Sequence, residues 1–433
     1  MKRPLVHVIG AGVAGLSAAY RLATSGRCDV VVHEARAYPG GRRRSFYDDA
    51  FGAAVDTGNF PLLSGWRSTL ALIDAVDARS EWRTDEAPGV AFADLAKGKQ
   101  WRLTPNAGRI PWWLLLTARR GPDLTPADYW PARRLLSARP EATVAVFAPK
   151  ESPALDLLWR PLTLAALNGE PEAVSARLAG AALLEIVTAG GGGLRLMAPV
   201  AGIGSALIEP LARAIERAGV TLRFGRRVVG LVPEGARAAA LEFEHDRVLL
   251  GPRDGVILAA SWETAAGLVP GVTTPSGASM SLTAHFAMPP PADAPLALGV
   301  INGPFHWLFT YGDRVSVTVK DAAVQMNKPR EIVAAECWRA VAALTGLSDV
   351  LPPWRVVRSR HAGFVSTPAE AARRPAGNKT QYANVFVAGG YVAPSASATI
   401  ESAVRSGEAA AQAFLTGQEK KVTAAMGTLR QKV

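Results

Sequence analysis

The stretch Val6-His7-Val8-Ile9-Gly10-Ala11-Gly12-Val13-Ala14-Gly15 opens the chain and decides the fold. Its first four residues form a short apolar run that predicts a buried parallel strand. Residues 16–23 then predict a helix, and residues 29–33 predict a second strand that ends at Glu34, nineteen residues after Gly15. The order strand, Gly-x-Gly-x-x-Gly, helix, strand and acid is typical of a dinucleotide-binding βαβ unit.

Each position of the glycine motif has a physical reason. Gly10 allows a tight turn, Gly12 allows the backbone to approach a pyrophosphate, and Gly15 allows close packing of the helix on the strand. Val13 and Ala14 lie where the helix begins, so their N–H groups and the positive end of the helix dipole are available to phosphates. We therefore expect the pyrophosphate to lie on this turn.

A second glycine pair follows the acid. Glu34, with Ala35 after it, is expected to accept hydrogen bonds from the adenosine ribose. The run Pro39-Gly40-Gly41-Arg42-Arg43-Arg44-Ser45 comes next, and it resembles the Gly-Gly-Arg-x-x-Ser run of the amine oxidase and carotenoid desaturase superfamily. The resemblance implies FAD as the cofactor, with Gly41 and Arg42 along its pyrophosphate and ribityl chain. Paired glycines permit close approach, and arginine binds phosphate in a bidentate manner.

Two further stretches extend the expected FAD site. Residues 384–390 read as a buried strand that ends in Gly389 and Gly390, and residues 398–407 open a helix with Thr399 and Ile400. A helix start at this place is expected to stabilise negative charge on the flavin. In the superfamily a residue placed like Val228 contacts the adenine through its backbone. We expect the FAD to be non-covalent, because neither Cys28 nor Cys337 lies near these motifs.

Composition limits the other classes of function. The chain has 433 residues, of which 49% are hydrophobic and 20% are charged, and this excludes global disorder. The net charge is +11, which favours an anionic partner, but the arginines are dispersed and no nucleic-acid-binding motif is found. We see no signal peptide, no run long enough to span a membrane and no cluster of metal ligands. The sequence favours a cytoplasmic protein.

The sequence predicts an α/β fold with two domains. A discontinuous Rossmann-like FAD-binding domain is expected from residues 1–66, 200–270 and 380–420. A mixed α+β substrate domain is expected from residues 67–199 and 271–379, with a polar tail over 421–433. The arrangement as a whole is similar to that of the amine oxidases and desaturases.

The segment Gly108-Arg109-Ile110-Pro111-Trp112-Trp113-Leu114-Leu115-Leu116 stands out, because two arginines follow it at Arg119 and Arg120. A short apolar segment flanked by cations suits contact with a membrane interface or the mouth of a lipophilic tunnel. A core helix of the substrate domain is the alternative. The net charge favours the membrane, so we expect peripheral association with the anionic inner face of the cytoplasmic membrane.

Several runs in the substrate domain narrow the resemblance to one family. Residues 160–168 (RPLTLAALN), 171–176 and 351–357 (LPPWRVV) are similar to runs in bacterial hydroxysqualene dehydroxylases, the FAD-dependent proteins of squalene and hopanoid biosynthesis. The resemblance continues at Pro105-Asn106 and at residues 398–401, and it covers about residues 5–415. It implies a long isoprenoid substrate whose allylic hydroxyl is replaced by a hydride from reduced flavin.

The chain departs from the family pattern at two places. Asp56-Thr57-Gly58-Asn59-Phe60 stands where the family reads Asp-Asn-Gly-Gln-His, and Gly390 stands where the superfamily has an aspartate. We expect Gly58 to lie against the cofactor, Asp56 to be a candidate proton donor and Asn59 a candidate orienter of the hydroxyl. The alternative for both candidates is a structural role beside the cofactor.

Two other functions stay open at this point. The first is a desaturase or amine oxidase of the same fold, in which electrons flow from the substrate to oxidised flavin. The second is a non-catalytic protein that binds lipid or scaffolds a complex. The oligomeric state and the physiological reductant are not indicated by any motif.

Overall fold

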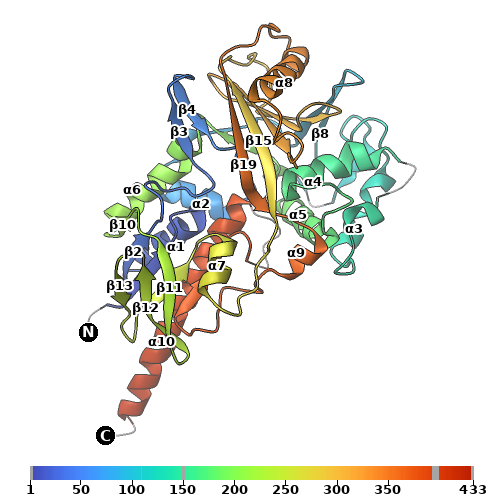
Figure 1. Cartoon of the computed structure of the whole chain (residues 1–433). Coiled ribbons are helices and arrows are strands. Elements are labelled where there is room, and N and C mark those ends of the chain that lie inside the picture. The colour runs from blue at the N-terminus through green and yellow to red at the C-terminus, as the bar shows by residue number, and fades with distance from the viewer. Residues whose placement is uncertain (1–2, 109, 149–151, 393–398, 431–433) are drawn as a thin grey trace. The chain divides into compact units, whose positions relative to one another are not determined.

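The structure is a computed structural model that describes residues 3–108, 110–148, 152–392 and 399–430 (Figure 1). The chain forms two compact units. Unit 1 consists of Met1–Gly41, Ile208–Thr274 and Arg374–Val433, and unit 2 consists of Arg42–Leu207 and Pro275–Arg373. Both units are therefore assembled from segments that are far apart in the sequence.

A five-stranded parallel sheet forms the centre of unit 1, in the order β10-β2-β1-β14-β20. Its strands are β1 Leu5–Ile9, β2 Asp29–His33, β10 Thr221–Arg223, β14 Gly255–Leu258 and β20 Val385–Val387. The strands β14 and β20 are buried at every position, and β1 and β2 are buried at all positions but the first. Such continuous apolar runs are typical of parallel sheets that helices cover on both faces, and the predicted βαβ start of the chain is confirmed.

Four helices belong to unit 1: α1 Val13–Thr24, α6 Glu209–Arg217, α7 Trp262–Leu268 and α10 Ile400–Arg430. The helix α1 packs against both α6 and α10, and the long α10 is drawn in red in Figure 1. A Cβ atom on Gly407 would lie 2.2 Å from the carbonyl oxygen of Ala14. The two helices can approach this closely only because α10 has a glycine at the crossing.

Residues 220–224 and 227–232, which follow Gly219, predict two strands in the sequence, and both are present, but they belong to different sheets. The first is β10, at the edge of the parallel sheet, and the second is β11 Val228–Glu234. With β12 Arg237–Phe243 and β13 Arg247–Leu249, β11 forms a three-stranded antiparallel sheet. A bulge between Val228 and Gly230 interrupts the register where β11 begins.

A seven-stranded mixed sheet forms the centre of unit 2, in the order β19-β15-β18-β17-β16-β7-β8. Its strands are β7 Val90–Asp94, β8 Lys99–Leu103, β15 Ala278–Phe286, β16 Ala297–Ile301, β17 Trp307–Thr310, β18 Val315–Lys320 and β19 Trp354–Phe364. Helix α8 (Arg330–Thr345) packs against β15 and β19, and the Phe286 and Trp338 rings lie 5.1 Å apart in the core between them. The residue pattern of the sequence predicts strands around 281–287 and 306–320 and a helix over 329–345, and the structure confirms all of them.

The rest of unit 2 consists of short strands and helices. The strands are β3 Ser45–Asp48, β4 Ala53–Asp56, β5 Leu62–Leu63, β6 Trp82–Thr84 and β9 Leu196–Pro199. The helices are α2 Arg67–Ala75, α3 Ala132–Leu135, α4 Arg160–Leu167, α5 Ala176–Ala189 and α9 Pro368–Ala372. The sequence of residues 151–190 predicts a segment rich in helix, and the structure has α4 and α5 there.

The boundaries of the units differ from those of the predicted domains. Residues 42–66, which we expected in the FAD-binding domain, belong to unit 2. Their pairing explains the difference: β3 pairs with β4, β5 pairs with β9, and Asp48 forms an ion pair with Arg355 of β19. Residues 200–207 likewise belong to unit 2.

The C-terminal segment also differs from the prediction. Helix α10 extends to Arg430, so it includes residues 421–430, which we expected to be a polar tail. Across the described ranges, no helix combines the length and the hydropathy that a passage through a bilayer requires.

Candidate functional site

The glycine turn after β1 has three glycines with different surroundings. A Cβ atom on Gly10 would lie 2.7 Å from the carbonyl oxygen of Ala259, and one on Gly15 would lie 1.9 Å from the carbonyl oxygen of Gly10. These two positions are therefore closed to any side chain. At Gly12, whose φ is −76°, an added Cβ atom would meet nothing within 4 Å. The turn is open at the one glycine where the motif requires a ligand to approach.

The start of α1 offers backbone amides to that open space. Gly12 is the N-cap residue and has no side chain that could cap the helix. Val13 and Ala14 form its first turn and are both buried. An uncapped helix start with a positive dipole end is an anion site. The residues present here fit the pyrophosphate of a dinucleotide.

The second glycine pair lies against the first turn. The amide of Gly40 donates to the carbonyl oxygen of Ala11 at 2.8 Å, and Gly12 and Gly40 form an isolated β-bridge. Gly40 and Gly41 both have left-handed backbones, with φ of +107° and +60°. A Cβ atom on Gly41 would lie 3.4 Å from the Cα atom of Gly12. The predicted proximity of the two glycine runs is thus present within unit 1.

Glu34 ends β2 and lies beside the same turn. Its Oε2 atom accepts from the amide of Ala11 at 2.8 Å, and its Oε1 atom accepts from the amide of Arg36 at 2.9 Å. The carbonyl oxygen of Glu34 accepts from the amide of Arg226, two residues before Val228. Glu34 therefore lies beside the segment that leads into β11, on which Val228 is the first residue. Each carboxylate oxygen keeps a lone pair for a further donor.

The C-terminal stretch contributes a loop and a helix start. The amide of Gly389, after β20, donates to the Ser406 hydroxyl at 3.0 Å. Thr399 precedes α10, and its hydroxyl accepts from the amide of Ser402 at 3.1 Å, so a side chain caps the helix that begins at Ile400. Gly390 is buried, and Ala398 lies outside the described residues.

In unit 2, Asp56 ends β4 and is fully buried. Its carboxylate accepts from the Ser45 hydroxyl at 2.5 Å and, through both oxygens, from the amide of Ile203 at 3.1 Å. Burial raises the pKa of Asp56 to about 6, although Ser45, Ile203 and the Arg314 guanidinium oppose the shift. These contacts hold the loop at residue 203, so they favour the structural alternative, and the role of Asp56 as proton donor stays a prediction.

Asn59 also has partners at both ends of its amide. Its Oδ1 atom accepts from the Tyr311 hydroxyl and its Nδ2 atom donates to the Thr318 hydroxyl, each at 2.8 Å. His285, which is fully buried on β15, donates through Nε2 to the carbonyl oxygen of Asp56 at 2.9 Å. Residues on β15 and β18 and the residue that follows β17 therefore hold residues 56–59 in place. The role of Asn59 as a hydroxyl orienter stays a prediction.

Phe60 and two arginines complete this region of unit 2. The Phe60 ring would lie 3.1 Å from a Cβ atom on Gly58, and the Arg43 guanidinium lies 5.7 Å from the centre of that ring. Burial and the neighbouring Arg42 lower the pKa of Arg43 to about 9. Burial and Arg43 lower the pKa of Lys320 to about 8. The half-buried cations Arg42, Arg43 and Lys320 therefore lie close together in unit 2.

Sequence reasoning missed two groups of residues. His285 lies within a predicted strand. A single histidine among mostly apolar neighbours is the one signal in the sequence that could have marked this residue as functional. Asn168 and Ser279 line a pocket, described below, and no local pattern marks Ser279. Both groups depend on strands and helices that meet only in the folded chain.

The site in unit 1 defines the class of protein. A parallel sheet whose first strand leads through an open glycine turn into an uncapped helix, with an acid at the end of the next strand, is the architecture of dinucleotide-binding proteins.

The comparison with known proteins gives the family. The family model described as flavin containing amine oxidoreductase matches residues 13–415, and the chain belongs to this family. A cyclohexylamine oxidase from Brevibacterium oxydans has a similar fold, with a TM-score of 0.69 at 16% identity over 97% of this chain and 100% of that one. The predicted fold class is confirmed, and the protein is an FAD-dependent oxidoreductase.

Two relatives are similar over nearly their whole length. A hydroxysqualene dehydroxylase from Rhodopseudomonas palustris is 40% identical over 95% of this chain and 98% of its own. A hydroxysqualene dehydroxylase from Sinorhizobium fredii is 38% identical with the same coverage. The predicted resemblance to this group is confirmed.

Proposed function

We propose that the protein reductively removes the allylic hydroxyl of hydroxysqualene to give squalene. The observation that carries the proposal is the 40% identity to a hydroxysqualene dehydroxylase over 95% of the chain, because this length includes unit 2 as well as the nucleotide-binding unit 1. The glycine turn and Glu34 support the cofactor that such a reaction needs. The electron flow is from flavin to substrate, opposite to that of an amine oxidase.

The reaction sets clear tasks for the chain. Replacement of the hydroxyl by hydrogen consumes one proton and one hydride and releases one water, and FAD in its reduced form supplies the hydride when bound. The protein must bind the alcohol, orient its carbinol carbon, exclude bulk water and provide the proton.

We propose that FAD is held by backbone and side-chain groups of both glycine runs, the acid and the C-terminal loop. These residues are Gly10, Gly12, Val13, Ala14, Gly15, Glu34, Ala35, Gly41, Arg42, Gly58, Val228, Gly389, Gly390, Thr399 and Ile400. The open space at Gly12 and the free lone pairs of Glu34 support the assignment.

The activity is tested by anaerobic incubation of the full-length holoenzyme with chemically reduced FAD and hydroxysqualene. We expect squalene as the product, and in D2O one deuterium at the former carbinol carbon, because the hydride of reduced flavin exchanges with solvent. A holoenzyme that contains flavin and forms no squalene would disprove the proposal. Bleaching of the oxidised flavin by an amine or a polyene would instead indicate the oxidase or desaturase.

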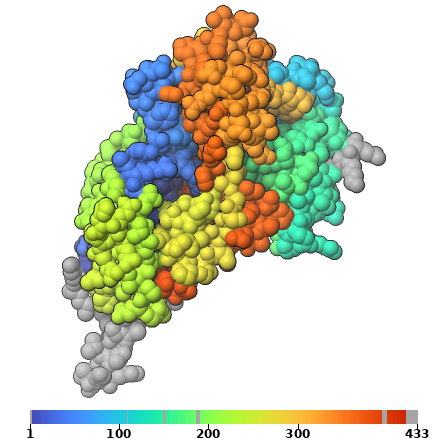
Figure 2. All heavy atoms as spheres, in the orientation of Figure 1, coloured from blue at the N-terminus to red at the C-terminus, as the bar shows by residue number. Residues whose placement is uncertain are grey.

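We also propose that the protein contacts an anionic membrane surface through residues 110–116. The short turn Trp112–Leu115 has no buried residue, so the alternative of a core helix is wrong. Ile110 is 77% exposed and Leu115 is 72% exposed. In Figure 2 the colours between light blue, near residue 100, and yellow-green, near residue 200, mark the part of the chain to which this segment belongs. Arg109 lies outside the described residues.

Cations accompany the exposed aromatic rings of this part of unit 2. The Arg119 guanidinium lies 5.0 Å from the centre of the Trp112 ring, and that of Arg133 lies 4.6 Å from the centre of the Trp130 ring. Trp130 is itself 61% exposed. Exposed Trp, Leu and Arg together favour a lipid interface with anionic headgroups. Such a surface is found at the inner face of the cytoplasmic membrane, which we propose as the location.

Co-sedimentation with phosphatidylglycerol vesicles tests this contact. We expect Leu115→Ser to reduce vesicle binding about threefold to tenfold, since a buried leucine side chain contributes roughly 1.5 kcal/mol or less when partly inserted. Leu249→Ser is the matched control, because Leu249 is 78% exposed in unit 1. Equal losses in both variants would contradict the assignment of the membrane contact to residues 110–116.

A further inference from the structure

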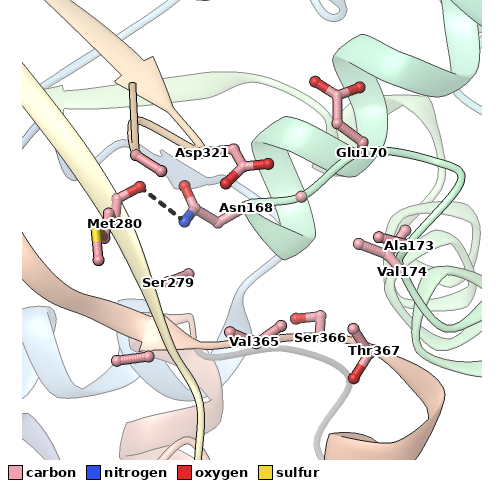
Figure 3. Close-up of a pocket in the computed structure, with 13 residues that line it drawn as sticks. Asn168, Glu170, Ala173, Val174, Ser279, Met280, Asp321, Val365, Ser366 and Thr367 are labelled. Atoms are coloured by element: carbon pink, nitrogen blue, oxygen red, sulfur yellow. Dashed lines mark hydrogen bonds between the residues drawn. The ribbon is translucent and has the colours of Figure 1, made fainter. Parts of the chain in front are cut away.

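Unit 2 contains a pocket of about 150 Å³ whose lining residues differ from the FAD-binding and candidate catalytic residues described above (Figure 3). Its walls come from the end of α4, the first residues of β15, the residues after β18 and the residues after β19. Asn168, Ser279, Val174 and Val365 are among the residues that line it. The pocket therefore lies where four segments of unit 2 meet. The first of these segments is more than 100 residues from the others in the sequence.

Two polar atoms on the wall have no protein partner. The Oδ1 atom of Asn168 and the Oγ atom of Ser279 are both buried and make no hydrogen bond. Ser279 as a whole is only 7% exposed. A buried polar atom without a partner costs about 1–3 kcal/mol, so native proteins retain such atoms where a ligand or water satisfies them.

The other polar side chains of the wall are already engaged. The Ser366 hydroxyl donates to the carbonyl oxygen of Leu167 at 3.0 Å, and the Thr367 hydroxyl accepts from the amide of Glu370 at 3.3 Å. Glu170 forms an ion pair with Arg160. Asp321 is exposed and its carboxylate is open to water. Among the described residues that line the pocket, Asn168 and Ser279 thus carry the buried polar atoms that have no partner.

The orientation of the Asn168 amide follows from its neighbours. Its Nδ2 atom donates to the carbonyl oxygen of Met280 at 3.4 Å, which the dashed line in Figure 3 marks. A carbonyl oxygen can only accept, so this bond fixes Oδ1 as the atom that remains. Asn168 is the C-cap residue of α4 with a left-handed backbone (φ +54°), a conformation that asparagine tolerates well. The acceptor is thus held in place by the backbone.

The side chains that line the pocket indicate the chemical class of the ligand. Val174, Val365, Ala278 and Met280 make most of the lining apolar, and the two unused atoms are uncharged. An aliphatic hydroxyl can donate to Asn168 Oδ1 and accept from the Ser279 hydroxyl, while its carbon neighbours contact the apolar side chains. No cation is among the residues that line the pocket, so a phosphate or carboxylate is disfavoured.

We propose that this pocket recognises the hydroxyl group of the isoprenoid alcohol substrate, with Asn168 as acceptor and Ser279 as donor. The inference rests on the proposed function and names the residues that distinguish substrate from product. A pocket of this volume holds only the few carbons around the hydroxyl, so the rest of the chain must leave through its opening. Squalene has no hydroxyl and leaves both atoms unsatisfied, which favours release of the product.

Equilibrium binding to the full-length protein with oxidised FAD tests the proposal, because no turnover occurs in that state. We expect the wild type to bind hydroxysqualene about tenfold more tightly than squalene. Ser279→Ala should reduce this preference severalfold, because only the contact with Asn168 remains, and should leave the affinity for squalene unchanged. It should not lower Tm, because the hydroxyl has no partner in the free protein. Ser279→Thr keeps a hydroxyl and should restore the preference.

Ser316→Ala is the matched control. The Ser316 hydroxyl is also buried on the same sheet and has no partner, but it does not line the pocket. This variant should keep the tenfold preference. If Ser279→Ala keeps it as well, or if the wild type shows none, the pocket assignment is overturned. An active wild type would then leave the proposed reaction intact, whereas a wild type that forms no squalene disproves the reaction itself.

Discussion

The contacts of Asp56 show that this buried residue holds the loop that follows it. Its oxygens accept from Ser45 and Ile203, and its backbone carbonyl oxygen accepts from His285. The loop that carries Gly58 and Asn59 is therefore fixed by residues from distant parts of unit 2. The carboxyl group favours its protonated form because burial raises its pKa to about 6.

The raised pKa of Asp56 predicts how stability depends on pH. Its contribution is fully present below the unfolded-state pKa of about 3.8 and is lost as the pH rises through about 6, at most about 3 kcal/mol in the free energy of unfolding. Asn cannot ionise, so Asp56→Asn should gain stability relative to the wild type between about pH 4 and pH 7.5. Urea unfolding at several pH values measures this difference. A constant difference across that range would mean that Asp56 is ionised throughout.

The element that carries the nucleotide site is the turn between β1 and α1. Its glycines have two separate tasks, since Gly15 permits the packing of the helix and Gly12 keeps the ligand space open. A substitution at Gly15 should therefore affect the stability of the fold, and a substitution at Gly12 should affect the binding of the ligand.

We predict that Gly15→Ala lowers the free energy of unfolding by at least about 1–3 kcal/mol, because the new methyl group would lie 1.9 Å from the Gly10 carbonyl oxygen. Gly12→Ala should leave the stability of the apoprotein unchanged and strongly reduce FAD binding, because its methyl group meets only the ligand. Thermal unfolding without FAD and quenching of FAD fluorescence give the two measurements. A Gly12→Ala protein that is purified with a full complement of flavin would contradict the proposed path of the pyrophosphate.

At the scale of the whole molecule, the net charge of +11 acts together with the exposed apolar segment. We predict that binding to phosphatidylglycerol vesicles weakens as the salt concentration rises, because the Debye length falls from about 10 Å at 0.1 M to about 3 Å at 1 M. At high salt, the binding of the wild type that remains should come from the apolar segment, so Leu115→Ser should lose this remaining part. Co-sedimentation across a salt series measures both parts. Binding that does not respond to salt would exclude a role for the charge.

The sequence by itself determined the nucleotide-binding half of the protein. The apolar run before Gly10, the three spaced glycines and Glu34 are local patterns, and each follows from backbone geometry over a few residues. The runs at 160–168 and 351–357 indicated the family for the same reason, since they are contiguous.

Only the tertiary structure decided which residues surround the loop at 56–60 and the pocket at Asn168. Residues 42–66 follow the glycine run in sequence, yet β5 pairs with β9 and Asp48 pairs with Arg355, so they belong to unit 2. In the sequence, Ser279 is an ordinary strand residue. Only the folded chain brings it together with Asn168, at the end of α4, in the wall of one pocket. Contacts between segments more than 100 residues apart depend on packing and not on local periodicity, so a single sequence does not specify them.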